Sequence, residues 1–112
     1  MKKPNYTILK DKTIAVKALA GGKVQERLVG WNYTQLVAAF GQPTFTELHS
    51  GGKVRKEWVI QDNSTGEVFS IYDWKTESEE YTKVWLQEWN VGGKTKTSKF
   101  VTDIIIQLKQ KN

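Results

Sequence analysis

The sequence predicts a single α+β domain, in which an antiparallel sheet of roughly five to six strands carries two helices packed on one face. A chain of 112 residues has room for one hydrophobic core. Short runs of alternating apolar and polar residues are separated by glycine-rich or polar turns, which is typical of antiparallel strands. Two further segments have apolar residues at helical spacing, and we expect these helices to cover the sheet.

Residues 1–29 are predicted to form a basic group of short strands. On either side of a polar tip at 10–12, apolar residues alternate with other residues: Tyr6, Ile8, Ile14, Val16 and Ala18. The β-branched residues favour strand over helix in this part. A glycine pair at 21–22 then forms a turn, and a third strand follows within 24–29.

Residues 30–112 are predicted to form a core of helix, hairpin, strand and helix. Asn32 is a good N-cap for the first helix, and Gln35 lies where the return partner of a capping box belongs. Apolar residues recur at helical spacing up to Phe40, after which Gly41 and Pro43 end the helix.

The later strands are predicted over 54–61, 67–74 and 83–91, and the last helix over about 97–110. Alternation along 67–74 and 83–91 gives an aliphatic face on which we expect the helices to pack. It is formed by Phe69, Ile71, Val84 and Leu86. The opposite face holds Tyr72, Trp74, Trp85 and Trp89. Three readings of this aromatic face stay open: a second core layer under the N-terminal strands, an interface between copies of the chain, and a platform on which bases stack.

Residue counts exclude much of enzyme chemistry. The chain has no cysteine and one histidine, His49, so thiolate nucleophiles and cysteine or histidine clusters are excluded. Asp73 and Lys75 are expected to form a surface pair. We therefore expect a binding protein with no catalytic residues, no metal site and no cofactor. No apolar run approaches the ~18 residues of a membrane span, and no signal-peptide stretch is present, which predicts a cytoplasmic protein with no membrane partner.

Charge and tryptophan content point to an anionic ligand that carries rings. The net charge is +5, and five residues are tryptophan. Residues 1–31 carry +5, residues 32–93 carry −4 and residues 94–112 carry +4. If the two basic ends share a face, that face attracts anions. A solubility role for the charge and a core role for the tryptophans would explain the same counts.

The segment GGKTKTSK at 92–99 combines features of a phosphate-binding turn. Its two glycines allow backbone N–H groups to turn toward one point, a helix N-terminus is predicted to follow, and lysines and hydroxyls surround it. The Walker A spacing is absent, and a capped glycine turn with solvated lysines is an equal alternative. The candidate ligand-binding residues, here and on the aromatic face, are Tyr72, Trp74, Lys75, Trp89, Gly92, Gly93, Lys94, Thr95, Lys96, Thr97 and Ser98.

Several segments in this order resemble a group of small phage-encoded proteins that includes the anti-CBASS sponges. The segments are GWNY at 30–33 with FGQP at 40–43, EWVI at 57–60, IYDWK at 71–75 and EWNVGGK at 88–94. The resemblance covers roughly residues 30–108. Asn90 stands where the family has a histidine, and the loop at 75–82 is particular to this chain, so the ligand and its individual contacts are not carried over.

The resemblance implies a homo-oligomer, a dimer or tetramer, that sequesters a cyclic dinucleotide such as 3′,3′-cyclic GMP-AMP without cleaving it. Such a protein would inhibit the antiviral signalling of the bacterial host and would not be an enzyme. The alternative is a small phage inhibitor that binds nucleic acid or a host defence protein through its basic ends. Of these, nucleic acid is the less favoured partner.

Overall fold

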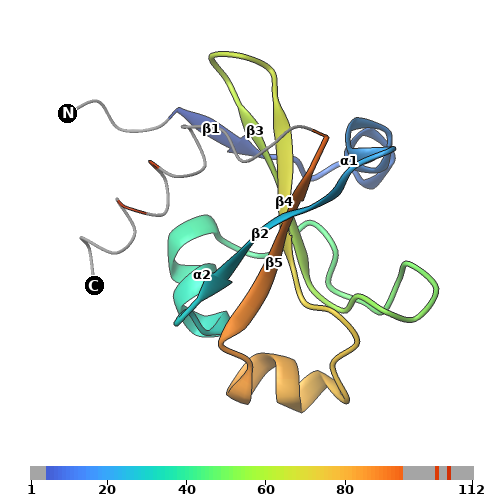
Figure 1. Cartoon of the computed structure of the whole chain (residues 1–112), viewed down its shortest axis with the longest axis vertical. Coiled ribbons are helices and arrows are strands. Elements are labelled where there is room, and N and C mark those ends of the chain that lie inside the picture. The colour runs from blue at the N-terminus through green and yellow to red at the C-terminus, as the bar shows by residue number, and fades with distance from the viewer. Residues whose placement is uncertain (1–4, 95–102, 104–105, 107–112) are drawn as a thin grey trace.

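A five-stranded antiparallel sheet organises the chain (Figure 1). The computed structural model describes residues 5–94, Asp103 and Ile106. The strands are β1 (Tyr6–Ile8), β2 (Lys23–Val29), β3 (Glu57–Asp62), β4 (Val68–Tyr72) and β5 (Glu88–Gly93), in the spatial order β1-β3-β4-β5-β2. The helical elements are α1 (Lys12–Leu19), α2 (Tyr33–Phe40) and a turn of π-helix, η1 (Tyr81–Trp85). The predicted α+β class is confirmed, and β1 and β2 form the two edges of the sheet instead of a covering layer.

The N-terminal prediction is wrong between residues 12 and 19, which form the helix α1 and not a strand. Asp11 caps this helix, because its carboxylate accepts a hydrogen bond from the Ile14 N–H at 3.1 Å. A buried strand face would need Ile14 and Val16 inside, yet both are more than half exposed and Ala15 is buried. The local cap therefore outweighs the β-propensity of the branched residues.

The helix α2 forms as predicted. The Gln35 N–H donates to Asn32 Oδ1 at 2.8 Å, and the Asn32 N–H donates to Gln35 Oε1 at 2.9 Å, so the capping box is complete. Gly41 ends the helix with a φ of 82°, a conformation that favours glycine. Leu36 and Phe40 are the buried residues of the helix, and both belong to the core.

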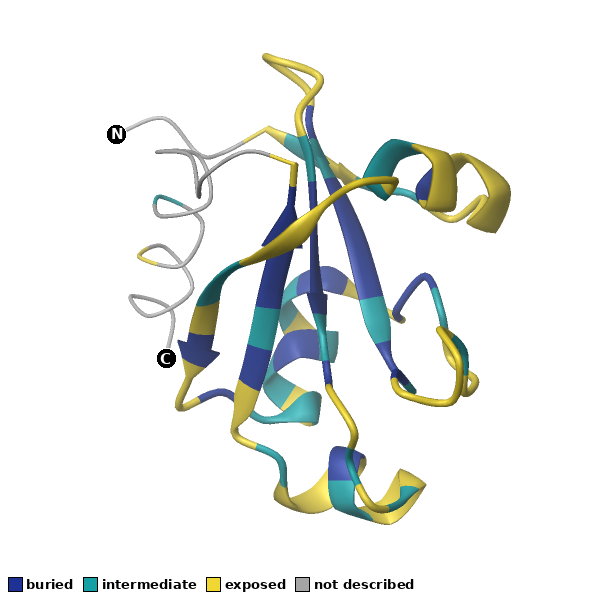
Figure 2. Ribbon diagram, turned by 45° about the vertical axis from the view of Figure 1, so that its right-hand side comes forward, coloured by how far each residue is buried: buried dark blue, intermediate teal, exposed yellow. Residues whose placement is uncertain are grey.

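The core lies on the side of the sheet that α2 covers, which we call the core face (Figure 2). Phe69 and Ile71 are buried there, as predicted. Trp58 and Trp89 are fully buried with ring centroids 5.5 Å apart and meet edge to face. The Trp58 indole N–H donates to the Gly41 carbonyl at 2.8 Å, and the Trp89 indole N–H donates to the Trp31 carbonyl at 2.9 Å.

The strand predicted over 83–91 begins only at Glu88, because the π-helical turn η1 occupies the positions before it. Alternation counted from residue 83 therefore has no meaning for β5. Val84, predicted on the aliphatic face, is 58% exposed. Trp89, predicted on the opposite face, shares the core face with Val91, which pairs with Ile71.

Among the residues that the structure describes, α2 is the only helix on the core face, so the predicted packing of two helices there is not shown. α1 lies apart from α2 (Figure 2), and its buried residue Ala15 is outside the core cluster. The last helix, predicted over 97–110, lies outside the described residues except for Asp103 and Ile106, which are helical.

Candidate ligand-binding face

The side of the sheet opposite the core, which we call the open face, carries a row of polar side chains across four strands. Glu57 of β3 pairs with Tyr72 of β4. Tyr72 pairs with Asn90 of β5, which pairs with Arg27 of β2. Paired residues point to the same face. Burial raises the pKa of Tyr72 although a hydrogen bond with Asn90 opposes this, so the phenol stays protonated at neutral pH.

A groove of about 750 Å³ opens at the Arg27 end of this row. It is lined by residues of β2 and β5 and by residues of the segment that joins β4 to β5. Trp74, which follows the end of β4, is 47% exposed, and Trp85, which ends η1, is 66% exposed. Two indoles and the cations of Arg27 and Lys75 share this groove, whose volume lies within the ~300–1,000 Å³ of small-molecule sites.

Two lysines contact the Trp74 ring. The ammonium nitrogens of Lys53 and Lys75 each lie 5.8 Å from the ring centre, which is within cation–π distance. The Lys75 N–H also donates to the Lys53 carbonyl at 2.7 Å, so the backbone holds the two residues together. Neither ammonium group has a carboxylate partner among the described residues. Both lysines are therefore available to an anion beside the ring.

Asp73 anchors the backbone directly before Trp74. Its carboxylate is fully buried and accepts four hydrogen bonds. The donors are the backbone N–H groups of Arg55 and Lys56, at 2.8 and 3.1 Å, and the hydroxyls of Thr76 and Thr82, at 2.9 and 2.8 Å. A buried carboxylate is tolerated because its lone pairs are satisfied in this way. The expected surface pair of Asp73 with Lys75 is therefore wrong.

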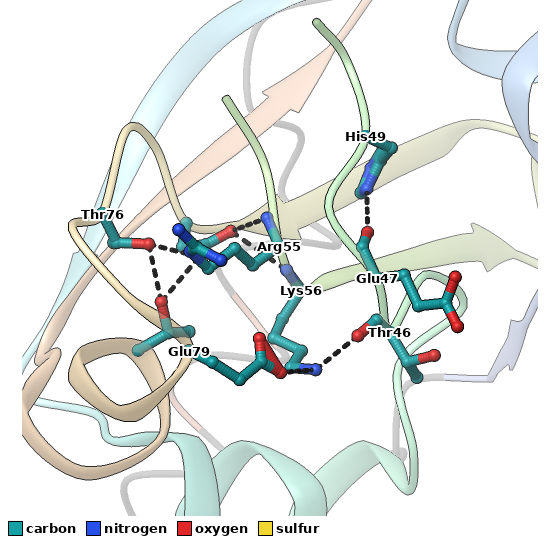
Figure 3. A network of polar contacts seen from close by, with 9 residues as sticks. Thr46, Glu47, His49, Arg55, Lys56, Thr76 and Glu79 are labelled. Carbon is teal, nitrogen blue, oxygen red and sulfur yellow. Dashed lines mark hydrogen bonds and ion pairs between the residues drawn. The ribbon is translucent and has the colours of Figure 1, made fainter. Parts of the chain in front are cut away.

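Lys56 anchors the segment between β4 and β5, which follows Asp73 and contains Glu79. Its ammonium group donates to the Thr46 carbonyl and pairs with the Glu79 carboxylate, as Figure 3 shows. The Lys56 side chain is 5% exposed, whereas that of Glu79 is 48% exposed. The loop that carries Trp74 and Lys75 is thus fixed at both of its ends by buried polar groups.

A smaller hollow, of about 200 Å³, lies on the open face, and Trp74 lines both the hollow and the groove. The hollow is lined from β3, β4 and α1 by Glu57, Ser70, Tyr72 and Leu19. Gly92 keeps it open, because a Cβ there would lie 3.1 Å from the Tyr72 ring and 3.6 Å from Ser70 Oγ.

His49 orients the Glu57 carboxylate at the edge of the hollow. Its Nε2 lies 2.8 Å from Glu57 Oε1, and its Nδ1 lies 2.8 Å from the Glu47 carbonyl oxygen. Both neighbours are acceptors, so only the imidazolium, with a proton on each nitrogen, satisfies both. Burial lowers the pKa of His49, but the hydrogen bonds to Glu57 and Glu47 and the charges of Glu57 and Asp73 outweigh it, and the pKa is raised overall.

The structure brings together three predicted site residues, Tyr72, Trp74 and Lys75. The Tyr72 and Trp74 rings meet edge to face with centroids 6.3 Å apart. Trp85, whose role the sequence left open, lines the groove together with Trp74 and Lys75. Sequence reasoning missed Glu57, Asn90 and Arg27 as site residues. Alternation within each strand indicates which face each of these residues lies on. It shows that they are neighbours only when the order of the strands is known.

The other predicted site residues lie elsewhere. Trp89 is wrong as a ligand contact, because it is fully buried in the core. Gly92 and Gly93 are paired residues of β5 without positive φ, so they form no phosphate-binding turn, although both line the hollow. Lys94 is exposed beyond the end of β5 and lines neither cavity. The remaining four lie outside the described residues: Thr95, Lys96, Thr97 and Ser98.

Within residues 5–94, Asp103 and Ile106, no helix has the length and apolar character needed to cross a membrane. The same part of the chain holds no group of three or more histidine, aspartate or glutamate side chains placed to bind a metal ion. Comparison of the chain with protein-family models, curated proteins and solved structures gives no match. The resemblance to anti-CBASS sponges therefore stays a prediction, and the groove and the hollow are the structural basis for a function.

Proposed function

We propose that the protein binds a cyclic dinucleotide in the groove and holds it without cleaving it. The observation that carries this proposal is the pair of exposed indoles, Trp74 and Trp85, in one groove of about 750 Å³ that also contains Lys75 and Arg27. A cyclic dinucleotide presents two flat bases and two phosphates, and this set of side chains offers rings to the former and cations to the latter.

Stacking supplies the main attraction in this proposal. Each base stacked on an aromatic side chain contributes about 1–3 kcal/mol. Lys53 and Lys75 lie beside the Trp74 ring without carboxylate partners in the described part of the chain, so they meet the phosphates at little cost. Arg27 pairs with Glu88 at 2.7 Å, but both side chains are more than half exposed, and such pairs exchange partners readily.

We extend the proposal to a homo-oligomer, a dimer or tetramer, in which a second copy closes the groove. Apolar side chains at and beside the groove support this: Val29 is 64% exposed, Val84 58% and Trp85 66%. Clustered exposed apolar residues mark interaction sites more often than isolated ones do. In this proposal the protein acts in the host cytoplasm as a phage-encoded inhibitor of CBASS defence, as the resemblance implies.

Titration calorimetry against a panel of cyclic di- and trinucleotides tests this function. We expect micromolar or tighter binding of at least one cyclic dinucleotide, with weak dependence on salt compared with a nucleic-acid binder. The ligand should be recovered intact after heat denaturation of the complex, as a sponge requires. Absence of binding to every member of the panel contradicts the proposal, and recovery of a linear product shows an enzyme instead.

A further inference from the structure

We propose that the hollow is a base subsite selective for guanine, and that Glu57 is the residue that reads the base. This inference rests on the proposed function, because it assigns one of the two bases of the cyclic dinucleotide to the hollow. The other base and the phosphates would occupy the groove. Trp74 lines both cavities and stands between the two subsites.

The two cavities lie within reach of one ligand. Glu57 and Arg27 are the ends of the row that crosses β3, β4, β5 and β2 on the open face. Neighbouring strands are about 4.8 Å apart, so the ends of the row are separated by about 14 Å. Tyr72 and Asn90 lie between them, with Tyr72 lining the hollow and Asn90 lining the groove. A ligand with two bases joined through two phosphates fits this arrangement.

The hollow has room for one base. Apolar cavities of about 150 Å³ accept a single aromatic ring, and the hollow measures about 200 Å³. Its size depends on Gly92, since any side chain at that position would project toward Tyr72 and Ser70. This explains a glycine within the paired part of β5, where the residue otherwise weakens the sheet.

The carboxylate of Glu57 selects for hydrogen-bond donors. Glu57 Oε1 accepts from His49 Nε2 at 2.8 Å, and Oε2 has no partner among the described residues. An ionised carboxylate only accepts hydrogen bonds. Guanine presents two adjacent donors, its N1–H and its 2-amino group, whereas adenine presents an acceptor at N1. Adenine would therefore place an acceptor against an acceptor and leave desolvated groups unpaired.

His49 keeps the Glu57 carboxylate in position. Its two ring nitrogens donate to Glu57 and to the Glu47 carbonyl, so the imidazolium bridges the carboxylate to the loop before β3. The Glu57 side chain is 12% exposed, which leaves it few alternative positions. His49 is thus a positioning residue for the subsite and does not itself line the hollow.

The test compares cyclic di-GMP, cyclic GMP-AMP and cyclic di-AMP by calorimetry, with the wild type and Glu57→Gln. We expect the wild type to bind the two guanine-containing ligands about tenfold or more tightly than cyclic di-AMP, the size of one good base-reading contact. Glu57→Gln retains an acceptor for His49 but adds a donor, so the preference should fall to within about twofold. Glu67→Gln, which removes an exposed acid that lines neither the groove nor the hollow, should leave the preference unchanged.

A second variant keeps the test decisive if Glu57→Gln does not fold. Gly92→Ala is compatible with the backbone, since Gly92 has no positive φ, and its methyl group would narrow the hollow. We expect it to weaken binding of guanine-containing ligands at least fivefold. The inference is overturned, and the proposed function left standing, by equal affinity of the wild type for all three ligands. The same holds if Glu57→Gln leaves the preference unchanged and Gly92→Ala leaves the affinity unchanged. Binding of none of the three overturns this inference, and absence of binding to the whole panel of cyclic nucleotides overturns the proposed function as well.

Discussion

The two faces of the sheet use tryptophan in different ways. On the core face, Trp58 and Trp89 are fully buried and each indole N–H donates to a backbone carbonyl. On the open face, Trp74 and Trp85 are about half exposed or more, and lysines contact the Trp74 ring. The same residue type therefore stabilises the fold on one side and, in the proposed function, stacks on a base on the other. The two roles predict opposite responses to the same substitution.

The largest effect is expected for Trp89→Ala. It removes a large buried side chain and leaves the Trp31 carbonyl without its donor, so the free energy of unfolding should fall by about 3–5 kcal/mol. Urea denaturation followed by circular dichroism measures this loss. A fall of less than about 1 kcal/mol would show that Trp89 does not belong to the core.

The next effect is expected for Asp73→Ala, which removes the anchor of the loop on the open face. The N–H groups of Arg55 and Lys56 would lose their acceptor, at a cost of about 2–3 kcal/mol in the free energy of unfolding. Asp73→Asn keeps one acceptor oxygen for these groups and should cost less than half as much. If Asp73→Ala is as stable as the exposed control Glu77→Gln, the network does not hold the loop.

Much of the fold could be predicted from the sequence, because its signals are local. The capping box of Asn32 and Gln35, the hairpin between β3 and β4 and the inward face of Phe69 and Ile71 need only neighbouring residues. The predictions failed where an alternating pattern was assumed to extend beyond the strand itself. Counting alternation through the π-helical turn η1 placed Trp89 on the wrong face.

The candidate site was harder to predict, because it depends on which strands become neighbours. Tyr72, Trp74 and Lys75 were predicted together because they are close in sequence, and each lines the hollow or the groove. Arg27 and Asn90 meet only because β2 pairs with β5, although they are 63 positions apart in the sequence. Asp73 was expected at the surface, because two of its four donors are backbone N–H groups of Arg55 and Lys56, which precede it by 18 and 17 positions. Neither the pairing order nor those donors is visible in a single sequence.

Trp74→Ala sharpens the comparison with Trp89, because it should affect binding and not folding. Loss of one stacked base costs about 1–3 kcal/mol, so affinity for the cyclic dinucleotide should fall by about 5- to 150-fold. The free energy of unfolding should change by less than about 0.5 kcal/mol, as for an exposed residue. Calorimetry and urea denaturation of the same preparation separate the two effects. Unfolding of this variant would place Trp74 with the core tryptophans.

The smallest expected effect is a pH dependence of the free energy of unfolding that arises from His49, which contacts Glu57 of the open face. The pKa of His49 is raised in the folded protein by its bonds to Glu57 and Glu47, against the opposing effect of burial. The native state thus holds this proton more tightly than the unfolded chain, whose histidine has a pKa near ~6.5. The stabilisation is fully present below that value and is lost as the pH rises through the folded pKa.

His49→Gln removes this dependence, and urea midpoints between pH 5.5 and 9 measure it. We expect the wild type to exceed the variant in stability by a constant amount at the acidic end, and the difference to shrink as the pH rises. The loss caused by Trp89→Ala should not change over the same range, because no titratable side chain hydrogen-bonds to that indole. A difference between wild type and His49→Gln that grows with pH would mean that burial dominates at His49 and that the imidazole is neutral. The open face would then present Glu57 without a cationic neighbour, and the two faces would differ in exposure alone and not in electrostatics.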